Sequence, residues 1–192
     1  MHPFRKYILN YTNLRENEWE QIEKCLSKKV YKKGDVILNN GKICRKLYFL
    51  EEGFLRYYIL KEGKDISKFF TEAPYCFTSQ RSFTKNIPTE DNIEALKDSI
   101  VWEMNRADAF ALLEIFNWSE FVRKLVQEVQ FYTEQILEKI KNKTAEELYI
   151  TMIQENDSIL TNVSLKHIAS YLGIAPQSLS RIRKKYWTNS KS

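Results

Sequence analysis

The residues best suited to recognising a partner lie near the C-terminal end, in the stretch Pro176-Gln-Ser-Leu-Ser-Arg-Ile-Arg-Lys-Lys185. Gln177 and Arg181 are four residues apart, so on a helix they share one face. A glutamine amide can pair with two atoms of adenine, and a guanidinium can pair with O6 and N7 of guanine. We therefore predict that Gln177 and Arg181, with Ser178 as a third group, read base edges in double-stranded DNA.

Two short helices are expected to position these side chains. Ser164 is a suitable N-cap for the first helix, Gly173 permits the turn that ends it, and Pro176 fits the first turn of the second. A small residue, Ala169, lets the two helices approach closely. Two helices joined by a Gly-containing turn, the second one basic, are typical of a helix-turn-helix. The apolar positions that would pack the pair are Leu165, Ile168, Ala169, Leu172, Leu179 and Ile182.

Excess positive charge is confined to this end of the chain. The formal net charge is +5, from 30 basic and 25 acidic residues, yet residues 158–192 contain six basic residues and no acidic one. Such asymmetry indicates a polyanion partner, although a solvated basic tail is the alternative. His167 is interpreted as a surface or phosphate-adjacent residue rather than a ligand. The groups expected to contact DNA phosphates are Ser164, Arg183, Lys184 and Lys185.

A long helix is predicted over residues 106–142, which contain no Gly or Pro. Apolar residues from Trp118 to Ile140 recur every three or four residues, close to the 3.5-residue period of a coiled coil. The alternative is a helix packed on its own domain through Phe121, Val126 and Leu137. We predict dimerisation, with a seam formed by Val122, Leu125, Val129, Tyr132 and Ile136.

Short strands are expected between residues 30 and 103. Apolar and aromatic runs alternate there with turn signals, and four of the five glycines lie in these turns. The spacing favours a compact sandwich or roll. A short helix over residues 17–26 is expected to precede it. The expected runs are Val36–Leu38, Leu47–Leu50, Phe54–Leu60, Ile66–Phe70, Ile93–Leu96 and Ile100–Trp102.

Several classes of function are disfavoured by composition. The two histidines and the lack of a Cys-x-x-Cys argue against a metal site, and no nucleophile or phosphate-loop motif is present, so we expect no enzyme, no cofactor and no metal. The three cysteines fit reduced thiols. No apolar run approaches the ~20 residues of a bilayer span, and the N-terminus does not resemble a signal peptide. We therefore expect a cytoplasmic protein.

These features together resemble the cyclic-AMP receptor protein / fumarate-nitrate regulator (Crp/Fnr) family of transcription factors. The resemblance covers nearly all of the chain and is strongest over Ile168–Lys184, with a second match over Leu47–Tyr58. It implies an α+β protein of two domains: a double-stranded β-helix (jelly roll) over 1–105, a dimerisation helix over 106–142, and a helix-turn-helix domain over 143–192. It also implies a homodimer, a palindromic DNA site, RNA polymerase as a partner and a small-molecule effector.

The chain departs from that family in two places. Cyclic-nucleotide-binding members have a Gly-Glu pair and an Arg-Ser or Arg-Thr pair, which align here with Thr78-Ser79 and Thr89-Glu90. Because Glu90 would repel the cyclic phosphate, we predict that cyclic AMP binds weakly or not at all. The chain also stops soon after Trp187, which implies a truncated wing. The candidates for an effector pocket are Thr78, Ser79, Arg81, Ser82 and Thr89.

Two other interpretations remain open at this stage. A ligand-binding β-roll sensor could act through protein contacts rather than DNA. A β-roll enzyme of the cupin type is disfavoured by the histidine count, since its metal site needs a His cluster.

Overall fold

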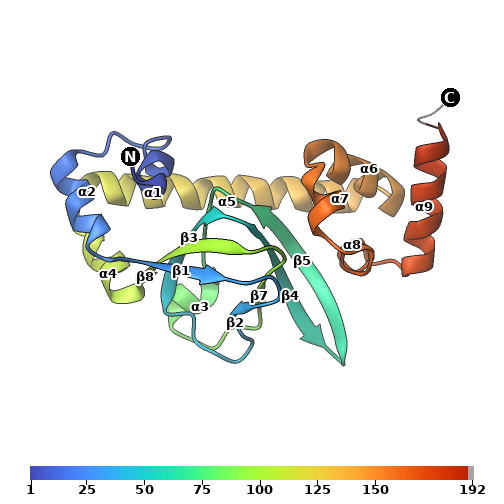
Figure 1. The fold of residues 1–192 in the computed structure, drawn as a ribbon, viewed down its shortest axis with the longest axis horizontal. Helices are drawn as coiled ribbons and strands as arrows, with labels where there is room; N and C mark the ends of the chain where they lie inside the picture. The colour runs from blue at the N-terminus through green and yellow to red at the C-terminus, as the bar shows by residue number, and fades with distance from the viewer. Residues whose placement is uncertain (190–192) are drawn as a thin grey trace.

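An antiparallel β-roll forms the N-terminal part of the chain, and α-helices form the rest (Figure 1). The computed structural model describes residues 1–189. The roll consists of two four-stranded sheets, with strand orders β1-β8-β3-β6 and β2-β7-β4-β5. The strands are β1 (Leu26–Tyr31), β2 (Val36–Leu38), β3 (Lys46–Glu52), β4 (Phe54–Lys61), β5 (Lys64–Glu72), β6 (Tyr75–Phe77), β7 (Asn92–Ala95) and β8 (Ser99–Asn105).

The roll strands coincide with the apolar runs of the sequence, which supply the buried side chains. All six expected runs lie within or overlap β2, β3, β4, β5, β7 and β8, whereas β1 and β6 were not expected. The polar run Leu26–Tyr31 pairs with β8 in the register Leu26 to Met104. Its central residues are exposed, so its sequence carries little of the apolar signal that marks a strand.

Gly53 permits the tight connection between β3 and β4. Its φ of +124° is a conformation that other residues rarely adopt, and an added Cβ would lie 2.1 Å from Ser99 Oγ. The lack of a side chain at Gly53 therefore lets this connection pass directly against Ser99, the first residue of β8.

The helices surround the roll or follow it. Only one short helix was expected before the roll, whereas the structure has two. The helices are α1 (Pro3–Ile8), α2 (Glu16–Glu23), α3 (Gln80–Lys85), α4 (Arg106–Ala111), a 3-10 turn at Leu112–Glu114, α5 (Phe116–Asn142), α6 (Ala145–Glu155), α7 (Ser158–Asn162), α8 (Leu165–Tyr171) and α9 (Pro176–Asn189). The truncated wing that the resemblance implies would follow α9, and residues 190–192 lie outside the described part of the chain.

The long helix begins ten residues later than the sequence predicts. Residues 106–115 form α4 and the 3-10 turn, and the continuous helix α5 runs from Phe116 to Asn142. The break is stabilised where the Trp118 Nε1 donates a hydrogen bond to the Ala109 carbonyl oxygen at 3.1 Å. In Figure 1, α5 passes along the roll and extends beyond it to α6–α9.

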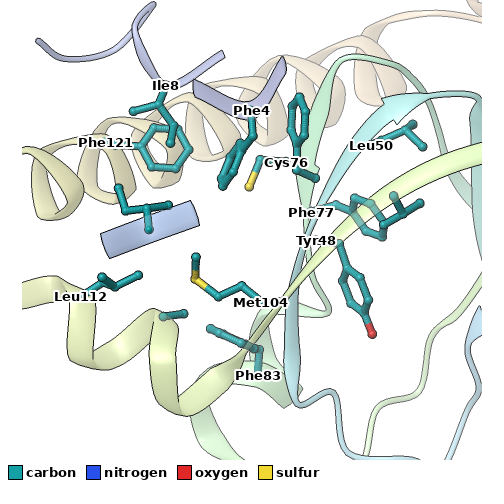
Figure 2. Packing of buried hydrophobic residues seen from close by; sticks show 14 of the residues in the cluster. Phe4, Ile8, Tyr48, Leu50, Cys76, Phe77, Phe83, Met104, Leu112 and Phe121 are labelled. Carbon is teal, nitrogen blue, oxygen red and sulfur yellow. The ribbon is translucent and has the colours of Figure 1, made fainter. Parts of the chain in front are cut away.

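Two hydrophobic clusters hold the fold together. In the first, aromatic residues of α1, β3 and α5 meet. The Phe4 ring stacks on the Phe49 ring with their centroids 4.7 Å apart and meets the Phe121 ring edge-on at 5.9 Å. Figure 2 shows Phe4 and Phe121 within this cluster. The second cluster joins Phe54 and Leu96 of the roll to residues of α6–α9. The helices at the C-terminal end therefore pack against the roll and are not connected to it through α5 alone. Among the described residues, no helix combines the length and apolarity that crossing a bilayer requires.

Candidate functional site

The helices α8 and α9, which we call the α8–α9 pair, are joined by the four residues 172–175. The Ser164 hydroxyl accepts a hydrogen bond from the His167 amide at the start of α8. Gly173 has a φ of +68° in the connection. Ala169 and Leu179 are both buried in the second cluster, so the two helices meet through a small and a large apolar side chain.

The three residues predicted to read bases lie on the open face of α9. Gln177, Ser178 and Arg181 are all exposed, whereas Leu179 is completely buried. Packing of one face thus leaves the opposite face available to a partner. The helix orients the glutamine amide, the serine hydroxyl and the guanidinium. Within residues 1–189, none of these three side chains makes a hydrogen bond or an ion pair with another residue.

The residues predicted to contact phosphates differ from one another in exposure and in ion pairing. Ser164 and Lys184 are exposed, while the Lys185 ammonium pairs with the Glu146 carboxylate at 2.8 Å. Arg183 is half-buried, and its Nε is buried without a hydrogen-bond partner. Lys184 is therefore the cation most freely available at this end of α9.

α8 docks directly on the edge strand of the roll. The Ser170 hydroxyl accepts a hydrogen bond from the Ser67 amide at 3.0 Å and donates one to the Asp65 carbonyl oxygen at 2.8 Å. The rings of Tyr171 and Phe70 are 5.6 Å apart. Because β5 ends its sheet, its outer backbone groups would otherwise lack strand partners, and one α8 side chain satisfies two of them.

A buried arginine lies beneath this contact. Arg56, only 2% exposed, donates to both carboxylate oxygens of Asp65 at 2.8 and 2.9 Å and pairs with Glu94 at 3.0 Å. His167 of α8 is half-buried beside this cluster, and its Nδ1 is buried without a partner. Burial and the Arg56 charge lower the pKa of His167 from its usual 6.5. His167 is thus part of the contact between α8 and the roll, not the surface residue that the sequence suggested.

A cavity of about 590 Å³ lies between the roll, α5 and α8. The roll supplies aromatic residues, α5 supplies a stripe from Trp118 to Ile136, and α8 supplies Tyr171. The charged residues among its lining are Lys68 and Asp91, whose ammonium and carboxylate groups are 2.6 Å apart. The aromatic lining residues are Tyr57, Phe69, Tyr75, Phe77, Phe83, Phe110, Trp118, Phe121, Tyr132 and Tyr171.

Most of the predicted effector residues do not line this cavity. Thr78 does, but its hydroxyl donates to the Lys46 carbonyl oxygen at 2.9 Å. The hydroxyls of Ser79 and Thr89 hydrogen-bond to each other at 2.8 Å. Ser79 and Thr89 belong to the two segments that align with the cyclic-nucleotide cassette. The two segments are therefore hydrogen-bonded to each other.

The two remaining effector candidates also have other roles or positions. Ser82 accepts from the Cys44 amide and donates to the Ile87 carbonyl oxygen, which ties α3 to the roll. Arg81 is exposed on α3 and is not among the lining residues. The predicted effector residues lie in the segment that also supplies Gln80, Phe83 and Asp91 to the cavity. The cavity itself was not predicted, because its lining comes from strands and helices far apart in the chain.

The five predicted seam residues all line the cavity. Val122, Leu125, Val129 and Ile136 are half-buried, and Tyr132 contacts the Phe69 ring at 5.7 Å. α5 therefore matches neither alternative fully, because the residues of the predicted seam line the cavity. Of the residues expected to pack on the helix's own domain, Phe121 is buried on the roll, whereas Leu137 is exposed. Among residues 1–189, no three His, Cys, Asp or Glu side chains gather as metal ligands.

The arrangement of a roll, a long helix and two further helices has known counterparts. Residues 28–116 match the family model of the cyclic nucleotide-binding domain. A protein from Eubacterium rectale, assigned to the Crp/Fnr family of transcriptional regulators, has a solved structure that is 21% identical. It aligns with a TM-score of 0.74 over 94% of this chain and 88% of its own. The chain has the Crp/Fnr fold.

Other proteins share the Crp/Fnr fold over a similar length. FixK2 from Bradyrhizobium japonicum is 20% identical, with a TM-score of 0.73 over 86% of each chain. The global regulator Clp from Xanthomonas campestris, described as responsive to c-di-GMP, is 11% identical, with a TM-score of 0.69 over 92% of this chain and 93% of its own. No curated protein sequence gives a significant match.

Proposed function

We propose that the chain is a homodimeric transcriptional regulator of the Crp/Fnr type, in which the α8–α9 pair is a helix-turn-helix that reads double-stranded DNA. The observation that carries this proposal is the exposed Gln177, Ser178 and Arg181 face of α9, opposite the buried Leu179. Such a helix can enter the major groove with its N-terminal end leading. In this arrangement Lys184 and Ser164 would contact phosphates, which position the helix.

Dimerisation is proposed through α5. Leu137 and Ile140 are 52% and 56% exposed, and Val126 is also exposed, so an apolar stripe lies open along this helix. Val126 lies one turn from Val122 and Val129, and Ile140 lies one turn from Ile136, so a partner's α5 could cover the stripe and extend the predicted seam. A two-fold dimer would present two reading helices to a palindromic site in the cytoplasm, with RNA polymerase as a further partner.

The decisive experiment is fluorescence anisotropy with the DNA upstream of the gene and with a scrambled duplex, at several salt concentrations. We expect tighter binding to the upstream duplex, and a loss of about 1–3 kcal/mol in Arg181→Ala. Arg123→Ala is the matched control, because Arg123 is an exposed arginine on α5 paired with Glu120 at 2.8 Å. Lys184→Ala should weaken binding to all duplexes and reduce the salt slope by about one.

Two results would contradict this function. Equal affinities of wild-type and Arg181→Ala for the upstream duplex would remove α9 from base reading. No DNA retention even at low salt would favour the alternative, a β-roll sensor that acts through protein contacts. The dimer is tested separately by sedimentation, where Leu137→Glu should give monomers.

A further inference from the structure

We propose that the tip of the β4–β5 hairpin, residues 61–64, contacts the phosphate backbone of DNA, so that the roll itself forms part of the DNA-binding surface. This inference rests on the proposed function and goes beyond it, because it adds a contact outside the helix-turn-helix. Every element that the structure describes within residues 143–189 is a helix, so the β-hairpin that flanks α8 comes from the roll.

Two lysines close this hairpin. Lys61 and Lys64 are directly paired at the end of β4 and β5, and the two residues Glu62 and Gly63 join them. Both turn residues have a positive φ, +51° and +73°, as in the type I′ turn of a tight hairpin. Residues paired in this way have side chains on the same face of the sheet. The two ammonium groups therefore project together from one face of the tip.

No other group of the described chain neutralises these two charges. Lys61 and Lys64 are exposed, and within residues 1–189 neither side chain makes a hydrogen bond or an ion pair. Like charges directly opposite each other destabilise a hairpin, and a bound anion would relieve the repulsion. Glu62 is the carboxylate of the turn itself, while the neighbouring Asp65 is engaged by the Arg56 guanidinium at 2.8 Å.

The docking of α8 places the tip towards the start of that helix. Tyr171, at the end of α8, meets the Phe70 ring of β5 at 5.6 Å, whereas His167, one turn earlier, lies beside Asp65. Going back along α8 therefore means going back along β5. Lys64 directly precedes Asp65, so the next residues of the hairpin extend towards the beginning of α8.

The beginning of α8 is the part of the helix-turn-helix that we expect to face the DNA backbone. Ser164 and Lys166 are both exposed there, and Ser164 is one of the predicted phosphate contacts. In a helix-turn-helix the first helix crosses the backbone while the second enters the groove. In Figure 1 the β4–β5 hairpin projects past the rest of the roll, and its tip lies below α8, whose lower side also leads to the start of α9. The tip thus extends the phosphate-facing side of α8.

The contact would position the protein without reading sequence. A lysine ammonium binds phosphate as a point charge and makes no distinction between bases. Each phosphate contact releases counterions, so each adds about 0.9 to the slope of log affinity against log salt concentration. Removing the tip lysines should therefore change affinity and salt slope, and leave the preference for one duplex over another unchanged.

The test is the double variant Lys61→Gln/Lys64→Gln in the anisotropy titration, with the upstream and the scrambled duplex at several salt concentrations. We expect both affinities to fall by a similar factor, about tenfold at low salt, and the salt slope to decrease by about two per protomer. Arg181→Ala should instead reduce the ratio of the two affinities. The thermal unfolding transition should stay cooperative, because both lysines are exposed.

The matched control is Lys6→Gln/Lys24→Gln, which removes the same charge. Lys6 is exposed on α1, and Lys24 is exposed directly after α2. Both helices lie at the other end of α5 from α6–α9 (Figure 1). The control should therefore keep the salt slope of the wild-type protein.

Two further variants test the charge and the position of the tip. Glu62→Gln removes the carboxylate of the turn and should tighten binding to both duplexes. Ser170→Ala removes the hydrogen bonds that hold α8 to β5. In that background the lysine double variant should lose less affinity than in the wild-type background, because the tip is no longer held beside α8.

Several outcomes would overturn the proposal. A salt slope unchanged in Lys61→Gln/Lys64→Gln would exclude phosphate contacts by the tip, and an equal decrease in the Lys6→Gln/Lys24→Gln control would assign the effect to net charge. A loss confined to the upstream duplex would contradict a backbone contact. No DNA retention by the wild-type protein would remove the hairpin contact together with the proposed function. If the tip lysines behave as expected but Arg181→Ala keeps its preference, the hairpin contact stands and base reading by α9 fails.

Discussion

The Ser170 hydroxyl on α8 donates a hydrogen bond to the Asp65 carbonyl oxygen on β5, 105 residues earlier in the chain. The same hydroxyl accepts from the Ser67 amide, so one side chain closes the edge of the sheet against α8. The contact fixes the orientation of α9 relative to the roll, because α8 and α9 share the buried Ala169 and Leu179.

Ser170→Ala should loosen this contact without unfolding the protein. Loss of the hydroxyl leaves the Ser67 amide without its partner, at a cost of about 1–3 kcal/mol if water cannot replace it. Faster amide hydrogen exchange at Ser67 is the expected readout. Ser180→Ala is the matched control, since the Ser180 hydroxyl bonds only the Pro176 carbonyl oxygen within its own helix. Unchanged exchange at Ser67 would show that the contact is not maintained in solution.

Arg56→Met should destabilise the protein far more than loss of an exposed arginine. Removing the guanidinium leaves Asp65 and Glu94 close together without their cation, and breaking a buried pair in this way costs about 3–5 kcal/mol. Arg123→Ala removes an exposed ion pair with Glu120, worth at most about 1 kcal/mol. Urea unfolding of the two variants tests the contrast, and equal midpoints would contradict it.

Stability should decrease as the pH falls below about 6.5, because burial and Arg56 lower the pKa of His167 in the folded state. The unfolded chain then binds more protons than the folded chain, so the free energy of unfolding decreases through this range until the lowered pKa is passed. Burial also lowers the pKa of His2, which adds a contribution of the same sign.

The histidine contributions can be separated by urea unfolding at about pH 7.5 and 5.5, on either side of the ordinary histidine pKa. His167→Gln should reduce the difference in stability between the two pH values, and His2→Gln should reduce it independently. A pH dependence that both variants retain in full would assign it to other groups.

Gly53→Ala should be severely destabilising, because the new Cβ would lie 2.1 Å from Ser99 Oγ and 2.8 Å from Ser99 Cα. Backbone must move to relieve the second clash, in a residue that also has a positive φ. Gly63→Ala is the control: its φ is +73°, but no atom lies within 4 Å of the added Cβ. Gly63→Ala should cost only about 1 kcal/mol, the strain of the left-handed backbone alone. Similar melting temperatures for the two variants would contradict the packing argument.

Local signals were sufficient for most of the elements. Runs such as Phe54–Leu60 and the cap at Ser164 depend on neighbours in the sequence, and the structure has β4 and α8 where these signals predict them. The break before Phe116 was missed, because Trp118 and Ala109 stabilise it through a hydrogen bond and no Gly or Pro marks it. The strand at Leu26–Tyr31 was missed because pairing with β8, rather than an apolar pattern, makes it a strand.

The sequence by itself determined the order of the elements, the basic C-terminal end and the face that Gln177 shares with Arg181, because helical spacing and charge are local properties. Only the tertiary structure decided which side of α5 meets the roll and which remains open, because an amphipathic helix with two apolar faces can pack either way. It also decided that Ser79 and Thr89 bond each other, and that Tyr171 of α8 completes a cavity whose other walls come from the roll and α5. Those contacts depend on how distant segments pack, and no spacing within the chain records that.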